Sequence, residues 1–568
     1  MRARWQAATA ASPSSPPSAD TTPSVSEPRQ RPPRPKRPRE LVRVAIEAGA
    51  FLVLLIVVLT LFAVVLSESH GKDAPPADAL LVSQSQDFAS LDPALAQSQQ
   101  AWELEYATCA KLVNYPPVAG YRGTRLVPEV AAAMPTISAD RLTYTFTLRR
   151  GWKLSNGDPV TARSFARAFE RARSPELVSP AEPYLREVRD WSARGNVLTI
   201  HLRSPAPDFV QRLALPYFCA VPTWAPDKQS DTLPSAGPYA IASYRYGRSL
   251  ILHRNPYYRG TRPARIDRIV YRFGAFPSQI RLQLEQGEVD YGSVSPSAFA
   301  SLAQQFHGDR RHLLVVQQPI VAYLALNTDR PLFKDNPQLR RAVNYALDRP
   351  ALARLFGPDG ATPADEYLPP GFPGYEPKHV YPVDGPDLAT ARRLAAGHLR
   401  GGHAVFLTCG TEDCGERAIV VADALRAIGL KVRIDTSPGQ LTLTGLRGTA
   451  FDIADVITRP DYGDPYGLLD KLLDGRVIRA VGNTNISYFA STRITNEIDA
   501  AQRLTGEARD RAYGRLGIDV ARTDAPLAAY AVLNARVFVA ARVGCITYQP
   551  VYGLDLAGTC LPKAPQRR

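Results

Sequence analysis

A strand, a turn and a helix follow one another without interruption in residues 321–352, and this order constrains the fold more than any other feature of the chain. The first six residues, VAYLAL, are all aliphatic or aromatic, which predicts a buried strand. The turn at 327–331 ends in a proline, which cannot continue a central strand. We expect Asp335 or Asn336 to cap the next helix, with Pro337 at its first position. Apolar residues then recur every three or four positions, so one face of this helix is predicted to be buried.

Two further blocks combine strands with helices. Residues 143–148, TYTFTL, alternate threonine with larger apolar residues, and an Asn-Gly turn and a predicted helix follow. A strand at 404–408, a helix at 418–428 and a strand at 431–434 then predict a sheet covered by helices. Because 568 residues are too many for one ordinary core, we expect at least two α/β domains.

Charge and motifs argue against two classes of function. The formal net charge is +14, but the body has no dense basic run and no basic-aromatic interleave, so nucleic-acid binding is not expected. G-x-S-x-G, H-E-x-x-H and Walker A motifs are absent, and the eight histidines form no obvious ligand set. We therefore predict no catalytic residues, no metal site and no cofactor.

The N-terminal segment predicts a membrane anchor. Residues 1–43 are rich in proline and basic residues, which is typical of a disordered tail. The run at 48–66 carries no charge and would span roughly 28 Å as a helix, so we predict a transmembrane anchor over 44–66 and a linker over 67–78. Basic residues before the run place the tail in the cytoplasm and the body outside the cell membrane. A cleaved signal peptide is the alternative.

The six cysteines predict disulfides, because an even number in an exported chain fits a disulfide framework. Two of the expected pairs follow from short spacing in the sequence, and the third is left by elimination. Free cysteine thiols are the alternative. The expected pairs are Cys409 with Cys414, Cys545 with Cys560, and Cys109 with Cys219. A C-x4-C spacing without a matching second pair does not fit the usual spacing of zinc ligands.

Several segments resemble one known family in the same order. ALNTDRPLFKDNPQLRRAVNYALDR, at 325–349, resembles the mid-chain signature of the bacterial extracellular solute-binding proteins of family 5, the peptide- and nickel-type receptors of ABC importers. Residues 142–172 closely resemble that family's most characteristic N-terminal block, a Phe-x-Leu-Arg strand followed by a turn and a helix. The Gly-Pro-Tyr at 237–239 and the Pro-Pro-Gly at 369–371 are also similar to family segments. The resemblance covers roughly residues 79–560.

The resemblance implies a fold and a function. It implies the α/β, two-lobed, type II periplasmic-binding-protein-like fold with a two-stranded hinge. The one transmembrane helix that the apolar run predicts before this fold departs from the family. The lobes are expected at 79–322 with 535–568, and at 323–534. Such a protein, a monomer, captures peptide or another small solute by lobe closure and delivers it to the permease and ATPase subunits of an ABC importer. Nickel, haem, oligosaccharides and peptides all occur as ligands in this family.

The segment DYGDP at 461–465 is the sharpest candidate site. It follows a predicted buried strand, and ligands of α/β sheets lie outside the strand C-termini. DYGDP resembles the family's Asp-x-x-Asp-Pro segment, which implies that Asp461 pairs with the free α-amino group of a peptide, with Tyr462 beside it. A loop-capping aspartate is the alternative for Asp461, and Asp464 is expected to shape the turn before Pro465.

Four more residues are candidates for ligand contact. Asn485 and Tyr488 belong to a segment that resembles the family's Asn-rich stretch near the cleft, and Phe88 and Tyr115 would contribute from the first lobe. Packing is the alternative for each of them.

Two other functions stay open. The unusual anchor and the long cytoplasmic tail suit a membrane-tethered receptor or regulator of cell-envelope biogenesis that uses the same fold without transport. An extracytoplasmic hydrolase is the second alternative, and it would need a nucleophile and a base in the cleft.

Overall fold

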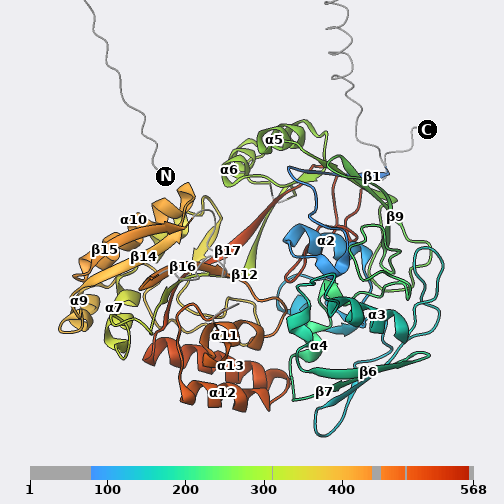
Figure 1. Cartoon of the computed structure of the whole chain (residues 1–568). Coiled ribbons are helices and arrows are strands. Elements are labelled where there is room, and N and C mark those ends of the chain that lie inside the picture. The colour runs from blue at the N-terminus through green and yellow to red at the C-terminus, as the bar shows by residue number, and fades with distance from the viewer. Residues whose placement is uncertain (1–77, 310, 438–449, 480–482, 562–568) are drawn as a thin grey trace, which may run out of the picture. The chain divides into compact units, whose positions relative to one another are not determined.

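The computed structural model describes residues 78–309, 311–437, 450–479 and 483–561 (Figure 1). The predicted tail and anchor, residues 1–66, lie outside these ranges, as does the predicted linker apart from its last residue. Within the described ranges, every helix is too short or too polar to cross a membrane.

Lobe I is the part of the chain before β12 (Leu313–Leu326) together with the residues after β17 (Leu527–Phe538), and it contains two larger sheets and two short two-stranded ones. One larger sheet is mixed: β1 pairs in parallel with β10 and β11, whereas β8, β9 and β10 pair antiparallel. In spatial order its strands are β11 (Tyr291–Gly292), β1 (Ala79–Gln84), β10 (Arg268–Phe273), β9 (Ser249–Arg254) and β8 (Tyr239–Arg245). The other larger sheet is antiparallel, with the strands β4 (Thr136–Ile137), β5 (Thr143–Thr147), β7 (Val197–Leu202) and β6 (Val188–Arg194). The alternation that predicts β5 is confirmed, because its two apolar side chains are buried.

Helices of lobe I complete its core. Phe165 and Phe169 of α3 (Ala162–Ala172) are fully buried against the four-stranded sheet, as the apolar spacing of this helix predicts. The helix α2 (Gln99–Thr108) is buried along nearly all its length. Buried residues from the C-terminal part of the chain, among them Val537 and Tyr552, pack into the same core.

Lobe II is built on one six-stranded sheet. In spatial order its strands are β13 (Ala361–Pro363), β17 (Leu527–Phe538), β12 (Leu313–Leu326), β16 (Ile453–Thr458), β14 (His403–Cys409) and β15 (Lys431–Ser437). The strands β14 and β15 are parallel and are linked by α10 (Glu412–Ala427), so the predicted β-α-β alternation is confirmed.

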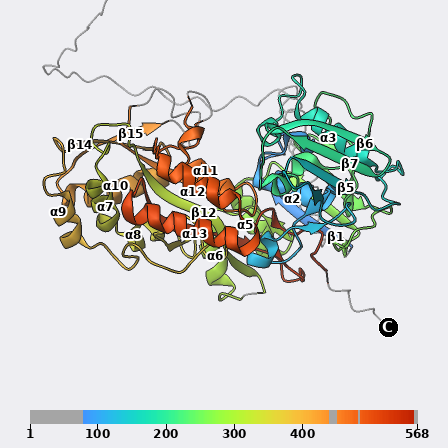
Figure 2. The ribbon, with the colours of Figure 1, turned by 90° about the horizontal axis from the view of Figure 1, so that it is seen from below.

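Both faces of this sheet are covered by helices, which explains the continuous apolar run in β12. Val321, Tyr323 and Ala325 face one core, while Ala322 and Leu324 face the other. The first core includes α11 (Tyr466–Leu473), α12 (Thr492–Gln502) and α13 (Gly506–Thr523), which lie in front of the sheet in Figure 2. The second includes α7 (Pro337–Ala346), α8 (Arg349–Arg354), α9 (Leu388–Ala395) and α10. The side chain of Asn336 caps α7 by accepting a hydrogen bond from Leu339 N at 3.4 Å.

Two long strands connect the lobes. The strands β12 and β17 pair antiparallel from the Leu313–Phe538 register to the Ala325–Leu527 register. The ends at Ala325 and Leu527 belong to the lobe II sheet. At the other ends, Leu313 and Phe538 pack in a small core with α5 (Pro277–Gln286) and α6 (Pro296–Gln305). The predicted lobe limits at 322/323 and 534/535 fall inside these strands and stay a prediction.

All three predicted disulfides are confirmed, with Cα–Cα distances of 5.5 Å for Cys109–Cys219, 5.6 Å for Cys409–Cys414 and 5.4 Å for Cys545–Cys560. These separations lie within the range that a disulfide spans without backbone movement.

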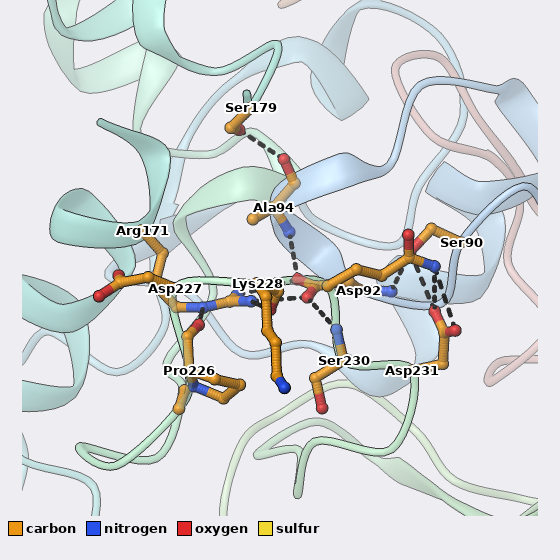
Figure 3. A network of polar contacts seen from close by, with 12 residues as sticks. Ser90, Asp92, Ala94, Arg171, Ser179, Pro226, Asp227, Lys228, Ser230 and Asp231 are labelled. Atoms are coloured by element: carbon orange, nitrogen blue, oxygen red, sulfur yellow. Dashed lines mark hydrogen bonds and ion pairs between the residues drawn. The ribbon is translucent and has the colours of Figure 1, made fainter. Parts of the chain in front are cut away.

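A buried ion pair joins three segments of lobe I (Figure 3). Both carboxylate oxygens of Asp92 accept hydrogen bonds from Arg171 on α3, at 2.9 and 2.6 Å. The backbone N–H groups of Ala94 and Ser230 donate to the same carboxylate at 3.0 and 2.9 Å. The hydroxyl of Ser179 donates to Ala94 O at 2.5 Å. The network therefore fixes Ser179 in place. The residues that follow it, 180–186, reach the surface of lobe I that faces lobe II.

Candidate functional site

The loop after β16 makes contact with lobe I through three consecutive residues. The carboxylate of Asp461 accepts a hydrogen bond from the Tyr184 hydroxyl at 2.8 Å. The Tyr462 hydroxyl donates to Asp208 at 2.5 Å, and Gly463 N–H donates to the Tyr115 hydroxyl at 2.9 Å. This loop, residues 461–465, lies beyond the last residue of a buried strand, where the sequence places the candidate site.

Close packing accompanies these hydrogen bonds. Gly463 lies so near lobe I that an added Cβ would come within 2.8 Å of the side chain and carbonyl oxygen of Thr124. Real Cβ atoms are essentially never found at that distance, so only glycine fits at this position while the lobes keep their present arrangement.

A cavity of about 540 Å³ opens beside the loop, between the two lobes. Its wall in lobe I consists of Pro180, Pro183, Tyr184, Arg186 and Arg212. Its wall in lobe II consists of Asp461, Tyr462, Asp470, Lys471, Val477, Arg479 and Thr484. The volume lies in the range of small-molecule sites, and the many charged groups indicate a polar ligand.

Asp461 is held by a second partner from its own lobe. The ammonium group of Lys471, on α11, forms an ion pair with the same carboxylate oxygen that binds Tyr184. The Asp461 side chain keeps 23% of its surface exposed toward the cavity. The carboxylate therefore already accepts an ammonium group, which is the interaction that the resemblance implies for a peptide.

The lobe I wall carries a compact charged cluster. Arg212 donates to both oxygens of Asp208 at 2.8 and 3.0 Å and to Glu187 at 2.5 Å. Burial alone would raise the pKa of Asp208, but Arg212 and the hydrogen bond from Tyr462 hold that pKa below its usual value. Burial raises the pKa of Tyr184 and of Tyr462 well above the usual value, so both hydroxyls stay protonated at neutral pH.

Asp464 shapes the loop rather than the cavity wall, as predicted. One of its carboxylate oxygens accepts from Tyr466 N at 2.9 Å, and the other forms a buried ion pair with Arg509. This pair ties the end of the loop to α13.

The four other candidates lie at separate places. Tyr115 is fully buried at the lobe contact, where its hydroxyl donates to Gln211 at 2.7 Å. Asn485 is fully buried, and its amide bonds to its own segment, including Phe489 O at 2.8 Å. Tyr488 packs against another aromatic ring, and Phe88 borders a different cavity of about 300 Å³ near the end of β1. Of the six sequence-predicted residues, the main cavity brings together Asp461 and Tyr462; ligand contact by any of the six stays a prediction.

Sequence reasoning did not find Tyr184, Arg186, Asp470 and Lys471. Tyr184 and Arg186 come from a proline-containing segment with no strand or helix periodicity. Asp470 and Lys471 lie on an amphipathic helix, where a charged pair normally indicates a solvated face. Only the placement of α11 against lobe I brings them to the cavity.

Comparisons with known proteins agree on one family. The family model described as bacterial extracellular solute-binding proteins, family 5 Middle, matches residues 125–478. The chain is 22% identical over 460 residues to the dipeptide-binding protein DppE of Bacillus subtilis (strain 168), covering 74% of this chain and 81% of that protein. It is 24% identical over 469 residues to the probable D,D-dipeptide-binding periplasmic protein DdpA of Escherichia coli (strain K12), covering 80% and 89%.

A solved structure has the same fold. The chain superposes on the clavulanic acid biosynthesis oligopeptide binding protein 2 with a TM-score of 0.75 and 24% sequence identity, covering 86% of this chain and 96% of that chain. The two-lobed α/β architecture is therefore shared along nearly the whole body.

Proposed function

Because the chain belongs to the bacterial extracellular solute-binding proteins of family 5, we propose that it captures peptides between its two lobes and delivers them to the permease of an ABC importer. Membership of this family means an extracytoplasmic solute-binding protein. That the solute is a peptide is our proposal, and it is supported by two relatives named as dipeptide-binding proteins.

The observation that carries the proposal is the cavity beside Asp461. A carboxylate that is partly exposed in a cavity between two lobes suits a peptide ammonium group, since hydrogen bonds to charged groups contribute on the order of 1.5–3 kcal/mol. The contacts of residues 461–463 with lobe I form only when the lobes meet. A ligand that bridges the lobes would therefore shift an open–closed equilibrium toward this arrangement.

The remaining parts of the proposal come from the sequence. The apolar run at 48–66 would tether the body to the membrane, with the tail in the cytoplasm. The lobes would divide at 322/323 and 534/535, with β12 and β17 as the hinge. The permease and its ATPase subunits would be the partners that use the closed, loaded form.

Thermal denaturation with defined peptides tests the proposal. We expect di- and trialanine with free amino ends to raise the melting temperature, because a ligand that binds only the folded state stabilises it by mass action. The N-acetylated peptides should produce a smaller shift, and Asp461→Asn should reduce the shift from the free peptides. Asp267→Asn is the matched control, since Asp267 is 65% exposed and pairs with Arg254 away from the cavity.

The outcomes separate the functions. A shift from free peptides supports capture of peptides. If no peptide changes the melting temperature, peptide capture is wrong, and the membrane-tethered receptor or regulator becomes the better reading of the same fold.

A further inference from the structure

Asp470 is a buried carboxyl group without a full set of partners. It lies on α11 next to Lys471, is 7% exposed and lines the cavity between the lobes. Its Oδ1 atom is buried and accepts no hydrogen bond from any described residue. Buried carboxyl oxygens in native proteins are nearly always hydrogen-bonded, so an orphaned one on a residue that lines a cavity indicates a missing partner.

Two neighbouring cations, Lys471 and Arg186, already bind other carboxylates. Lys471 forms its ion pair with Asp461. Arg186 donates to Glu187 at 2.7 Å. The other charged or titratable groups that influence Asp470 are Asp208 and Arg186 of lobe I, Lys471 of α11, and the phenols of Tyr462 and Tyr466.

An ammonium group that reaches Asp461 needs a second carboxylate to balance its charge, because Lys471 already pairs with Asp461. Lys471 neutralises Asp461, so an ammonium group that enters the cavity would meet a pair that is already balanced. Asp470 is the next residue along the helix, and it faces the same cavity. A carboxylate there restores the balance: two ammonium groups, those of Lys471 and the ligand, would then face two carboxylates.

We propose that Asp470 acts with Asp461 to hold the ligand's ammonium group and supplies the negative charge that balances it. This inference rests on the proposed function, because the ammonium group is that of a captured peptide or a similar amine. Lys471 then remains on Asp461 in the loaded protein, and the two carboxylates hold the two cations together.

The proposal makes binding release a proton. Burial raises the pKa of Asp470 to about 7, so in the empty protein the carboxyl is largely protonated below that pH. An ammonium partner favours the ionised form and lowers this pKa, so the proton leaves as the ligand enters.

Isothermal titration of the full chain with trialanine tests the inference. At about pH 6.5 the peptide amine is charged, and wild-type protein should release about half a proton or more per peptide, measured from the difference in heat between phosphate and Tris buffers. Asp470→Asn is isosteric and mimics the protonated carboxyl, so it should fold. In that variant we expect proton release to vanish and affinity to fall about tenfold or more.

The outcomes distinguish the two proposals. Asp267→Asn should keep both the affinity and the proton release of wild-type protein. If wild-type protein binds trialanine without proton release, or if Asp470→Asn keeps both, the role of Asp470 is wrong while peptide capture stands. If wild-type protein binds no peptide, both proposals fail together.

Discussion

Replacing Asp92 by alanine should destabilise lobe I strongly, because it leaves a buried arginine without its counter-ion (Figure 3). Asp92 and Arg171 are 0% and 1% exposed. The carboxylate accepts four hydrogen bonds, two from Arg171 and two from backbone N–H groups. After the change Arg171 keeps only the carbonyl oxygens of Pro226 and Lys228 as acceptors, at 2.7 and 3.2 Å.

The expected loss in the free energy of unfolding is about 3–5 kcal/mol, the usual cost of removing one partner from a buried ion pair. Asp267→Ala is the control, since Asp267 pairs with Arg254 on the surface of lobe I at 65% and 48% exposure. Exposed pairs contribute about 0–1 kcal/mol, so that variant should unfold nearly as wild-type protein does.

Urea unfolding followed by tryptophan fluorescence isolates lobe I. Of the five tryptophans, Trp102, Trp152, Trp191 and Trp224 belong to the lobe I part of the chain, and the fifth lies outside the described residues. A loss below about 1 kcal/mol, equal to that of the control, would refute the reasoning. Joint replacement by apolar residues, Asp92→Leu with Arg171→Met, should recover much of the loss, because neither charge is then buried alone.

Two further changes have definite expected results. Gly463→Ala should push the lobes apart, which raises the radius of gyration in X-ray scattering and weakens peptide binding; Gly415→Ala, with no atom within 4 Å of its added Cβ, should do neither, and an unchanged radius for both would contradict the close contact. Burial raises the pKa of Glu103 to about 8, so between about pH 4.5 and 8 the folded state binds more protons than the unfolded one and stability falls as pH rises, by at most about 1.4 kcal/mol per pH unit. Glu103→Gln should flatten this decline in urea midpoints measured at pH 5 and 8, and identical slopes would exclude Glu103 as its source.

Local patterns predict the elements but not the contacts between lobes. The apolar run at 321–326 and the Asn336 cap follow from rules that act over a few residues, and both are confirmed. The position of Asp461 beyond a strand end is likewise a local property. The ion pair of Asp461 with Lys471 and its hydrogen bond from Tyr184 depend on where α11 and residues 180–186 lie in three dimensions, and no short-range pattern encodes that.

The same limit applies to burial. Asn485 carries an amide that suits ligand contact, yet this amide donates to the backbone oxygens of Asp474 and Phe489. The sequence predicts an apolar strand at 321–326 but not that β12 begins at Leu313 and reaches the lobe I side, because the intervening residues alternate in burial and include a proline.

The path of the chain through β12 and β17 sets an order of completion during synthesis. All six strands of the lobe II sheet lie between Leu313 and Phe538, so that sheet can assemble as one continuous stretch. The core of lobe I is completed later, because residues from both ends of the body meet in it. Tyr552 stacks on Tyr106 with ring centroids 4.5 Å apart, and its hydroxyl donates to Asn114 at 2.9 Å. Each of these contacts joins residues more than four hundred positions apart in the sequence. Until the last part of the chain emerges, the first half of lobe I keeps apolar surface uncovered, which makes this nascent intermediate a substrate for chaperones and a point of aggregation.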